Sequence, residues 1–119
     1  MQEVLVLDDE KNIRLMVRRS LEGIGLKVEE AVSGEEALRK LAEKSFSLLL
    51  LDLRLPGEDG MEILQEVRTT YPQLAVIIIS AYGSIPLAVK ALKAGARDFL
   101  EKPFTPQDLN QVVEQAIAR

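Results

Sequence analysis

The sequence predicts an α/β fold, in which helices cover both faces of one parallel β-sheet. Short apolar runs alternate along the chain with longer segments whose apolar residues recur at helical spacing. Three of the runs, VLVL, LLLL and AVIII, are almost uninterrupted, as in strands that are buried on both faces. The resulting five strand–helix units are typical of a parallel sheet with right-handed crossovers.

Each apolar run is expected to form one strand. The five runs cover residues 4–7, 27–31, 48–51, 74–79 and 97–100. We expect the flavodoxin-like strand order 2-1-3-4-5, with ligands bound beyond the carboxyl ends of the strands. All five units fit one domain, residues 1–119, because domains of about 100–150 residues are the commonest.

The first three helices have start or stop signals in the sequence. One helix is expected from residue 11 to the glycine-containing turn at 23–25. Ser33 and Glu36 have the spacing of a capping box, and the second helix is expected to follow them. The third is expected over residues 58–70, before Pro72.

The last two helices are expected after residue 84 and after residue 105. The fourth begins near Ile85 and ends at Gly95. The fifth has Thr105 as its N-cap, Pro106 at the first helical position and Asp108 in the first turn. Its apolar stripe consists of Leu109, Val112, Val113, Ala116 and Ile117.

The composition excludes several kinds of site and partner. The chain has no histidine and no cysteine, which rules out histidine catalysis, thiol nucleophiles, disulfides and zinc–thiolate sites. A bound metal must then be a hard cation with oxygen ligands. The net charge of −4 argues against direct nucleic-acid binding. Neither a signal peptide nor a membrane-spanning run is recognisable, so we expect a cytoplasmic protein without membrane association.

Polar residues directly follow four of the five predicted strands. Taken singly, each has an ordinary explanation as a turn, a helix cap or a solvated surface residue. The carboxyl ends of parallel strands meet at one edge of a sheet, however, so the strand order brings these residues together. In strand order they are Asp8, Asp9 and Glu10, then Asp52, Ser80 and Lys102.

This combination favours phosphoryl chemistry assisted by Mg²⁺. Clustered carboxylates repel one another, and a divalent cation with oxygen ligands keeps them ionised. The charge of three such carboxylates, −3, is then balanced by the +3 of Mg²⁺ and the ammonium of Lys102. An ionised aspartate such as Asp52 can act as a nucleophile on phosphorus, while Lys102 neutralises the transferring group and Ser80 donates a hydrogen bond to it.

In their order along the chain, the motifs VLVLDDE, LLLLDLRLPGEDG, IIISAYG and DFLEKPF resemble the receiver domain of bacterial two-component response regulators. The resemblance covers essentially the whole chain. It implies a phosphoacceptor switch, and no enzyme activity beyond self-phosphorylation and self-dephosphorylation. The implied partner is a sensor histidine kinase or a phosphotransfer protein, and the implied cofactor is Mg²⁺.

The stretch AYGSIPLAVKALKAGARDFLEKPF is similar to receivers of the nitrogen-regulation type. These precede ATPase and DNA-binding domains in enhancer-binding transcription activators. The resemblance therefore implies a role in transcription regulation, with an effector domain that lies outside this chain.

The resemblance also implies a role for each residue of the site. Asp52 is the phosphoacceptor and a metal ligand, together with Asp8, Asp9 (the more direct ligand) and the backbone carbonyl of Arg54. Lys102 pairs with the phosphate, and the peptide bond between Lys102 and Pro103 is expected to be cis.

Further residues are implied in switching. Ser80 is the switch hydroxyl, Phe99 is the aromatic residue that turns inward on activation, and Arg54 and Tyr82 tune the lifetime of the phosphate. Phosphorylation is expected to change the surface of the fourth helix, fifth strand and fifth helix, and so to control an effector or a homodimer. Ordinary core packing is an equally good explanation of Phe99.

Three other functions remain as alternatives. A flavodoxin-like flavin carrier shares the fold, but the loop DDEKN repels a phosphate. A Mg²⁺-dependent phosphatase with an aspartate nucleophile usually has a second aspartate two residues later, where this chain has Arg54. A module for dimerisation alone would be indifferent to Mg²⁺ and to phosphodonors.

Overall fold

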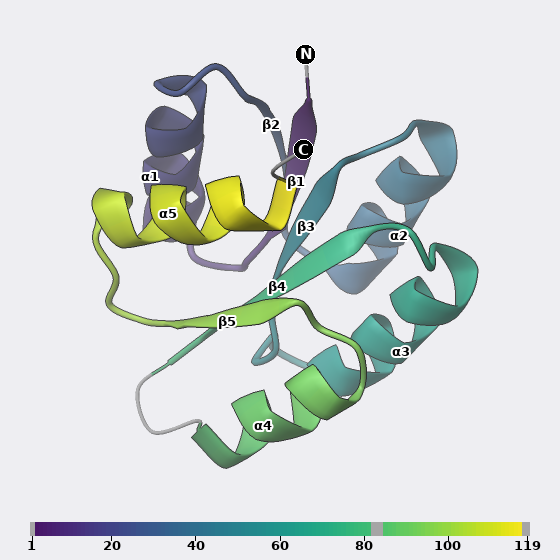
Figure 1. The fold of residues 1–119 in the computed structure, drawn as a ribbon. Coiled ribbons are helices and arrows are strands. Elements are labelled where there is room, and N and C mark those ends of the chain that lie inside the picture. Colours follow the sequence, from purple (N-terminus) through teal and green to yellow (C-terminus); the bar gives the residue numbers. More distant parts are fainter. Residues whose placement is uncertain (1, 82–84, 118–119) are drawn as a thin grey trace.

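The computed structural model describes residues 2–81 and 85–117. They contain a five-stranded parallel sheet in the order β2-β1-β3-β4-β5, which confirms the predicted order (Figure 1). The strands are β1 (Glu3–Leu7), β2 (Lys27–Ala31), β3 (Leu48–Asp52), β4 (Ala75–Ser80) and β5 (Asp98–Glu101).

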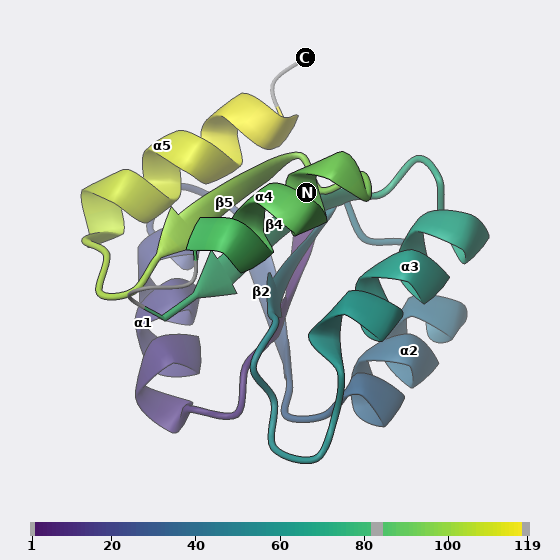
Figure 2. The same cartoon turned by 90° about the horizontal axis from the view of Figure 1, so that it is seen from below.

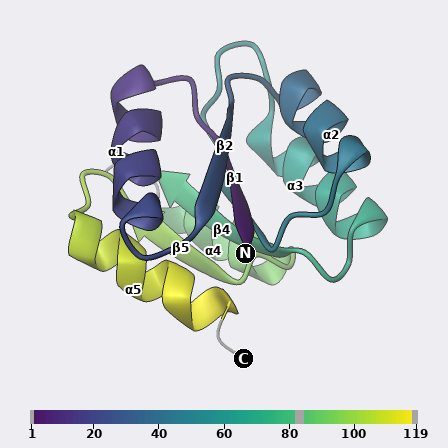
Figure 3. The same cartoon turned by 90° about the horizontal axis from the view of Figure 1, so that it is seen from above.

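Five helices cover the two faces of this sheet. They are α1 (Lys11–Glu22), α2 (Gly34–Glu43), α3 (Gly60–Thr70), α4 (Ile85–Lys93) and α5 (Pro106–Ile117). The helices α1 and α5 lie on one side, whereas α2 and α3 lie on the other, as Figures 2 and 3 show from opposite directions. In α4, the buried Ala91 belongs to the core on the α2–α3 side, and the partly buried Leu87 packs against this core. No helix in the described part of the chain is long and apolar enough to cross a membrane.

The central strands separate two cores, and this explains their uninterrupted apolar sequences. In β3, Leu49 and Leu51 belong to the core beneath α2, α3 and α4, whereas Leu48 and Leu50 belong to the core beneath α1 and α5. All four leucines are fully buried. Since successive side chains of a strand point to opposite faces, a strand covered on both sides needs an apolar residue at every position.

The strands β3 and β4 each extend one residue farther than the apolar runs predict. Asp52 ends β3, where it pairs in register with Ile79, and Ser80 ends β4, where it pairs with Glu101. Both polar residues therefore belong to the sheet itself and not to the loops after it. The sheet fixes where their side chains start.

The predicted helix caps form, with one change of partner. At α5, Thr105 Oγ1 accepts a hydrogen bond from the Asp108 N–H at 3.0 Å, and Asp108 Oδ2 accepts one from the Thr105 N–H at 3.3 Å. At α2, Ser33 Oγ accepts from the Glu36 N–H at 3.2 Å. The Glu36 carboxylate accepts from the Val32 N–H at 2.8 Å, one residue before the N-cap that a standard capping box would use.

The third helix begins later than predicted because Asp59 caps it. Asp59 Oδ1 accepts a hydrogen bond from the Met61 N–H at 2.9 Å, so the helix begins at Gly60 and not near Glu58. The Glu58 carboxylate instead accepts from the Gly34 N–H, the first residue of α2, at 2.7 Å.

Candidate functional site

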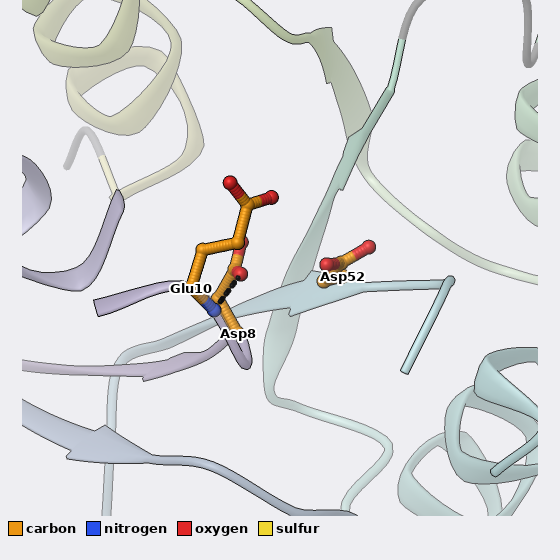
Figure 4. Close-up of side chains that lie close together, drawn as sticks. All are labelled: Asp8, Glu10 and Asp52. Carbon is orange, nitrogen blue, oxygen red and sulfur yellow. Dashed lines mark hydrogen bonds between the residues drawn. The ribbon is translucent and has the colours of Figure 1, made fainter. Parts of the chain in front are cut away.

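The acidic residues Asp8, Glu10 and Asp52 converge at the carboxyl edge of the sheet. Asp8 directly follows β1 and Asp52 ends the neighbouring strand β3, and both are almost fully buried. Glu10 comes from the β1–α1 loop and is exposed. One carboxylate oxygen from each lies within 4.8 Å of the other two, a spacing that can hold a metal ion (Figure 4).

Main-chain N–H groups fix the orientation of both buried carboxylates. Asp8 Oδ1 accepts a hydrogen bond from the Glu10 N–H at 2.8 Å, and Asp52 Oδ1 accepts one from the Arg54 N–H at 2.9 Å. In each case the donor is two residues further along the chain. The second oxygen of each carboxylate, Oδ2, points toward Lys102.

Lys102 brings an ammonium group to this cluster, from the segment after β5. Its Nζ lies 2.8 Å from Asp8 Oδ2, 2.9 Å from Glu10 Oε1 and 3.2 Å from Asp52 Oδ2. The Lys102 N–H donates to the Ser80 carbonyl at 2.6 Å, and the peptide bond to Pro103 is cis, as predicted. Three carboxylates and one ammonium carry a net charge of −2 when all are ionised, which suits one divalent cation.

The pKa shifts reflect this crowding. Burial raises the pKa of Asp8 above its ordinary value, because the hydrogen bond to Lys102 only partly opposes it. Burial alone would lower the pKa of Lys102, but the hydrogen bonds to Asp8 and Glu10 outweigh it and hold that pKa above its ordinary value. Lys102 is therefore charged throughout the neutral range. Ionisation of the buried Asp8 carboxyl therefore costs free energy in the metal-free fold.

The donor set fits Mg²⁺. All its groups are oxygen ligands, and Mg²⁺ prefers one or two carboxylates with several waters. The resemblance implied that Asp9 is a more direct ligand than Asp8. Asp9 is exposed, and the three acids whose oxygens lie close together are Asp8, Glu10 and Asp52. The sequence could have indicated Glu10 as a candidate ligand, because each of the three carboxylates in the acidic run DDE is a possible metal ligand.

The structure describes the other predicted residues with one exception. Ser80 is fully buried at the end of β4, and its Oγ has no hydrogen-bond partner among residues 2–81 and 85–117. Phe99 is half-buried in β5 and packs against the core beneath α4. The Arg54 side chain is exposed, while its N–H holds Asp52. Tyr82 lies outside the described residues.

We expect Mg²⁺ to stabilise the folded chain at neutral pH and to lose this effect in acid. The pKa of Asp8 is raised by folding, so a neutral Asp8 stabilises the metal-free fold at low pH, and this contribution is lost as the pH rises through the folded pKa. Mg²⁺ needs the ionised form. The stabilisation should reach about 1.4 to 2.7 kcal/mol when Mg²⁺ exceeds its dissociation constant ten- to hundredfold.

Thermal unfolding with Mg²⁺ or with a chelator, measured from pH 4 to pH 8, checks this expectation. Asp8→Asn should raise the unfolding midpoint of the metal-free chain and remove the Mg²⁺ effect. Glu10→Gln and Asp9→Asn then show which acid of the loop takes part. A Mg²⁺ effect of undiminished size in Asp8→Asn would contradict the metal site.

Comparisons with known proteins agree with this geometry. A family model described as the response regulator receiver domain matches residues 4–114. The DNA-binding transcriptional regulator NtrC of Escherichia coli K12 is 40% identical over 115 residues, which are 97% of this chain and 24% of that protein. The transcriptional regulatory protein ZraR of Klebsiella oxytoca is 40% identical over 116 residues, 98% of this chain and 26% of that protein. The chain thus spans about a quarter of the length of these relatives.

Solved structures of single receiver domains match along their whole length. The receiver domain of NtrX from Brucella abortus superposes with a TM-score of 0.93 at 38% identity, over 96% of this chain and 97% of that one. A structure described as the BeF3-activated DrrB receiver domain has a TM-score of 0.90 at 33% identity and covers 100% of this chain and 99% of that one.

Proposed function

The chain belongs to the response regulator receiver domain family of two-component systems, and from this premise we propose that Asp52 is its phosphoacceptor in a Mg²⁺-assisted switch. One observation supports this most directly. The Asp52 carboxylate is buried at the end of β3, held through one oxygen by the Arg54 N–H, with the other oxygen 3.2 Å from the Lys102 ammonium. A fixed carboxylate beside a cation is suited to attack on phosphorus.

In the proposed reaction, a carboxylate oxygen of Asp52 forms a bond to phosphorus as the bond between phosphorus and the donor's leaving atom breaks. Lys102 then pairs with a phosphoryl oxygen, and the unpartnered Ser80 hydroxyl donates to another. Asp8, Asp52, the Arg54 carbonyl and either Asp9 or Glu10 would hold Mg²⁺. When bound, this ion supplies positive charge that neutralises the phosphoryl oxygens.

Intact-mass measurement after incubation with acetyl phosphate tests the proposal. With Mg²⁺ the chain should gain the mass of one phosphoryl group, and peptide mapping should locate it on Asp52. With a chelator the gain should disappear. A chain that gains no mass under either condition, or gains it elsewhere, would overturn the proposal.

The natural donor in this proposal is a sensor histidine kinase or a phosphotransfer protein in the cytoplasm. The relatives are transcription regulators about four times the length of this chain, one of them described as DNA-binding. Their length supports an effector domain outside the present sequence that acts in transcription. The chain itself would show no turnover beyond self-phosphorylation and self-dephosphorylation, because the position of a phosphatase's second aspartate is Arg54. Arg54, together with Tyr82, is proposed to tune the lifetime of the phosphate.

The output surface is proposed to be α4, β5 and α5. Ile85, Val89 and Leu92 lie at spacings of four and three residues along α4 and are 50%, 43% and 42% exposed. They form an apolar stripe on a helix whose other side packs into the core. Movement of Ser80 toward the phosphoryl group would make room for Phe99, which shares the core with α4, and this movement would shift the helix.

Phosphorylation is accordingly expected to raise the fraction of homodimer that forms through α4. Sedimentation with and without acetyl phosphate measures this fraction. Val89→Lys should reduce it, whereas Leu15→Lys, at an apolar residue of similar exposure on α1, should leave it unchanged. An unchanged mass after phosphorylation would remove the dimer from the proposal, but not the phosphoacceptor.

A further inference from the structure

The side chain of Arg14 connects β2 to the main chain of the acidic cluster. Arg14 lies in α1 and its side chain is only 13% exposed. Its Nε donates a hydrogen bond to Glu30 Oε1 at 2.9 Å, and its Nη1 donates to the main-chain carbonyl of Asp8 at 2.8 Å. One guanidinium therefore joins the carboxylate of a strand to the peptide group of a candidate metal ligand.

Without Arg14, the Asp8 carbonyl would have no hydrogen-bond partner among the residues that the structure describes. The ladder of β1 ends at Leu7, and the Asp8 N–H still donates to the Ala31 carbonyl at 3.2 Å. The Asp8 side chain is held by the Glu10 N–H. With Arg14 in place, the N–H, the carbonyl and the carboxylate of Asp8 are all bonded, so that its carboxylate has a fixed place opposite Asp52.

Glu30 holds Arg14 in position and also binds a second arginine, Arg18. Arg18 Nε donates to Glu30 Oε2 at 2.8 Å, and its Nη1 donates to Glu22 at 3.1 Å. Burial raises the pKa of Glu30, but the hydrogen bonds from Arg18 and Arg14 outweigh it, and the pKa lies below its ordinary value. Glu30 therefore remains ionised at neutral pH. Both arginines bind the Glu30 carboxylate, but of the two it is Arg14 that also donates to the Asp8 carbonyl.

We propose that Arg14 is a positioning residue of the site: clamped by Glu30, it fixes the main chain of Asp8 and thereby the distance of its carboxylate from Asp52 and Lys102. The inference rests on the proposed Mg²⁺-assisted function. Residues that orient metal ligands typically change metal affinity by about ten- to a hundredfold when they are replaced.

The chemistry of the contact requires arginine. The planar guanidinium presents several N–H donors in a fixed fork, so it serves Glu30 and the Asp8 carbonyl at once. A lysine ammonium is a compact charge on a flexible stem and lacks this geometry. Arg14→Lys therefore keeps the charge near the site, and hence the electric field on the cation, while it breaks the bridge.

The experiment compares Arg14→Lys with Arg18→Lys in the full chain. Mg²⁺ affinity is measured by calorimetry without a phosphodonor, and hydrogen exchange is measured at the amides of residues 8–10. Arg14→Lys is expected to weaken Mg²⁺ binding about tenfold and to speed exchange at these amides. Arg18→Lys should change neither by more than about twofold, since it leaves the bond to Asp8 intact.

Three results would overturn the inference: Arg14→Lys with the parent's Mg²⁺ affinity, an equal loss of affinity in Arg18→Lys, or a parent without measurable Mg²⁺ binding. The proposed function can fail independently of this inference. A parent chain that binds Mg²⁺ but is not phosphorylated on Asp52 would contradict the proposed function and not the role of Arg14. Unfolding midpoints in chelator show whether both variants fold.

Discussion

Replacement of Asp52 by asparagine is expected to abolish phosphorylation of the chain by acetyl phosphate. The amide has nearly the same shape as the carboxylate, but it is neutral and a poor nucleophile toward phosphorus. The substitution also removes one of the three carboxylates that face Lys102. The rate should fall by about a thousandfold or more, as it does when an enzyme loses its nucleophile.

Asp59→Asn is the matched control for this variant. Asp59 lies in the loop that joins β3 to α3, is exposed, and caps α3 through its side-chain oxygen, a role that asparagine can also perform. Intact mass should show one phosphoryl group on Asp59→Asn and none on Asp52→Asn. A phosphoryl group on folded Asp52→Asn would place the acceptor elsewhere in the chain.

Gly60→Ala is expected to cost about 3 kcal/mol of folding stability, a large part of the roughly 5–15 kcal/mol of a typical domain. Gly60 is buried at the start of α3. A Cβ there would lie 2.5 Å from the carbonyl oxygen of Leu53 and closer still to its Cα. These atoms belong to the main chain, so the clash can be relieved only by moving the loop itself.

The same movement should impair the site, because Leu53 directly follows Asp52. Urea unfolding in chelator measures the loss of stability, and intact mass measures the loss of phosphorylation. Gly23→Ala is the control: its backbone is right-handed helical at φ −63°, and a Cβ would lie 3.3 Å from two carbonyl oxygens, a tight contact that a shift of a few tenths of an ångström relieves. It should change stability by less than about 1 kcal/mol. Equal stabilities of the two variants would contradict the close approach at Gly60.

The sequence by itself determined the elements and their order. Uninterrupted apolar runs require strands covered on both faces, and Thr105 with Asp108 sets the start of α5 through contacts only three residues apart. Patterns of this kind depend on neighbours in the chain. The candidate acids were recognisable too, since each follows or ends a strand and the sheet order brings strand ends together.

Only the tertiary structure decided which acid of the β1–α1 loop turns toward Asp52. Asp9 and Glu10 are adjacent carboxylates in the same loop, and it is Glu10 whose Oε1 lies 2.9 Å from the Lys102 ammonium. The bond from Arg14 to Asp8 and the bond from Glu58 to Gly34 join segments whose separation no local pattern encodes. The physical reason is that an apolar pattern determines which face of a helix or strand is buried. A polar side chain can bond to any of several groups, and its actual partner is determined only when packing has set the distances between the helices and strands.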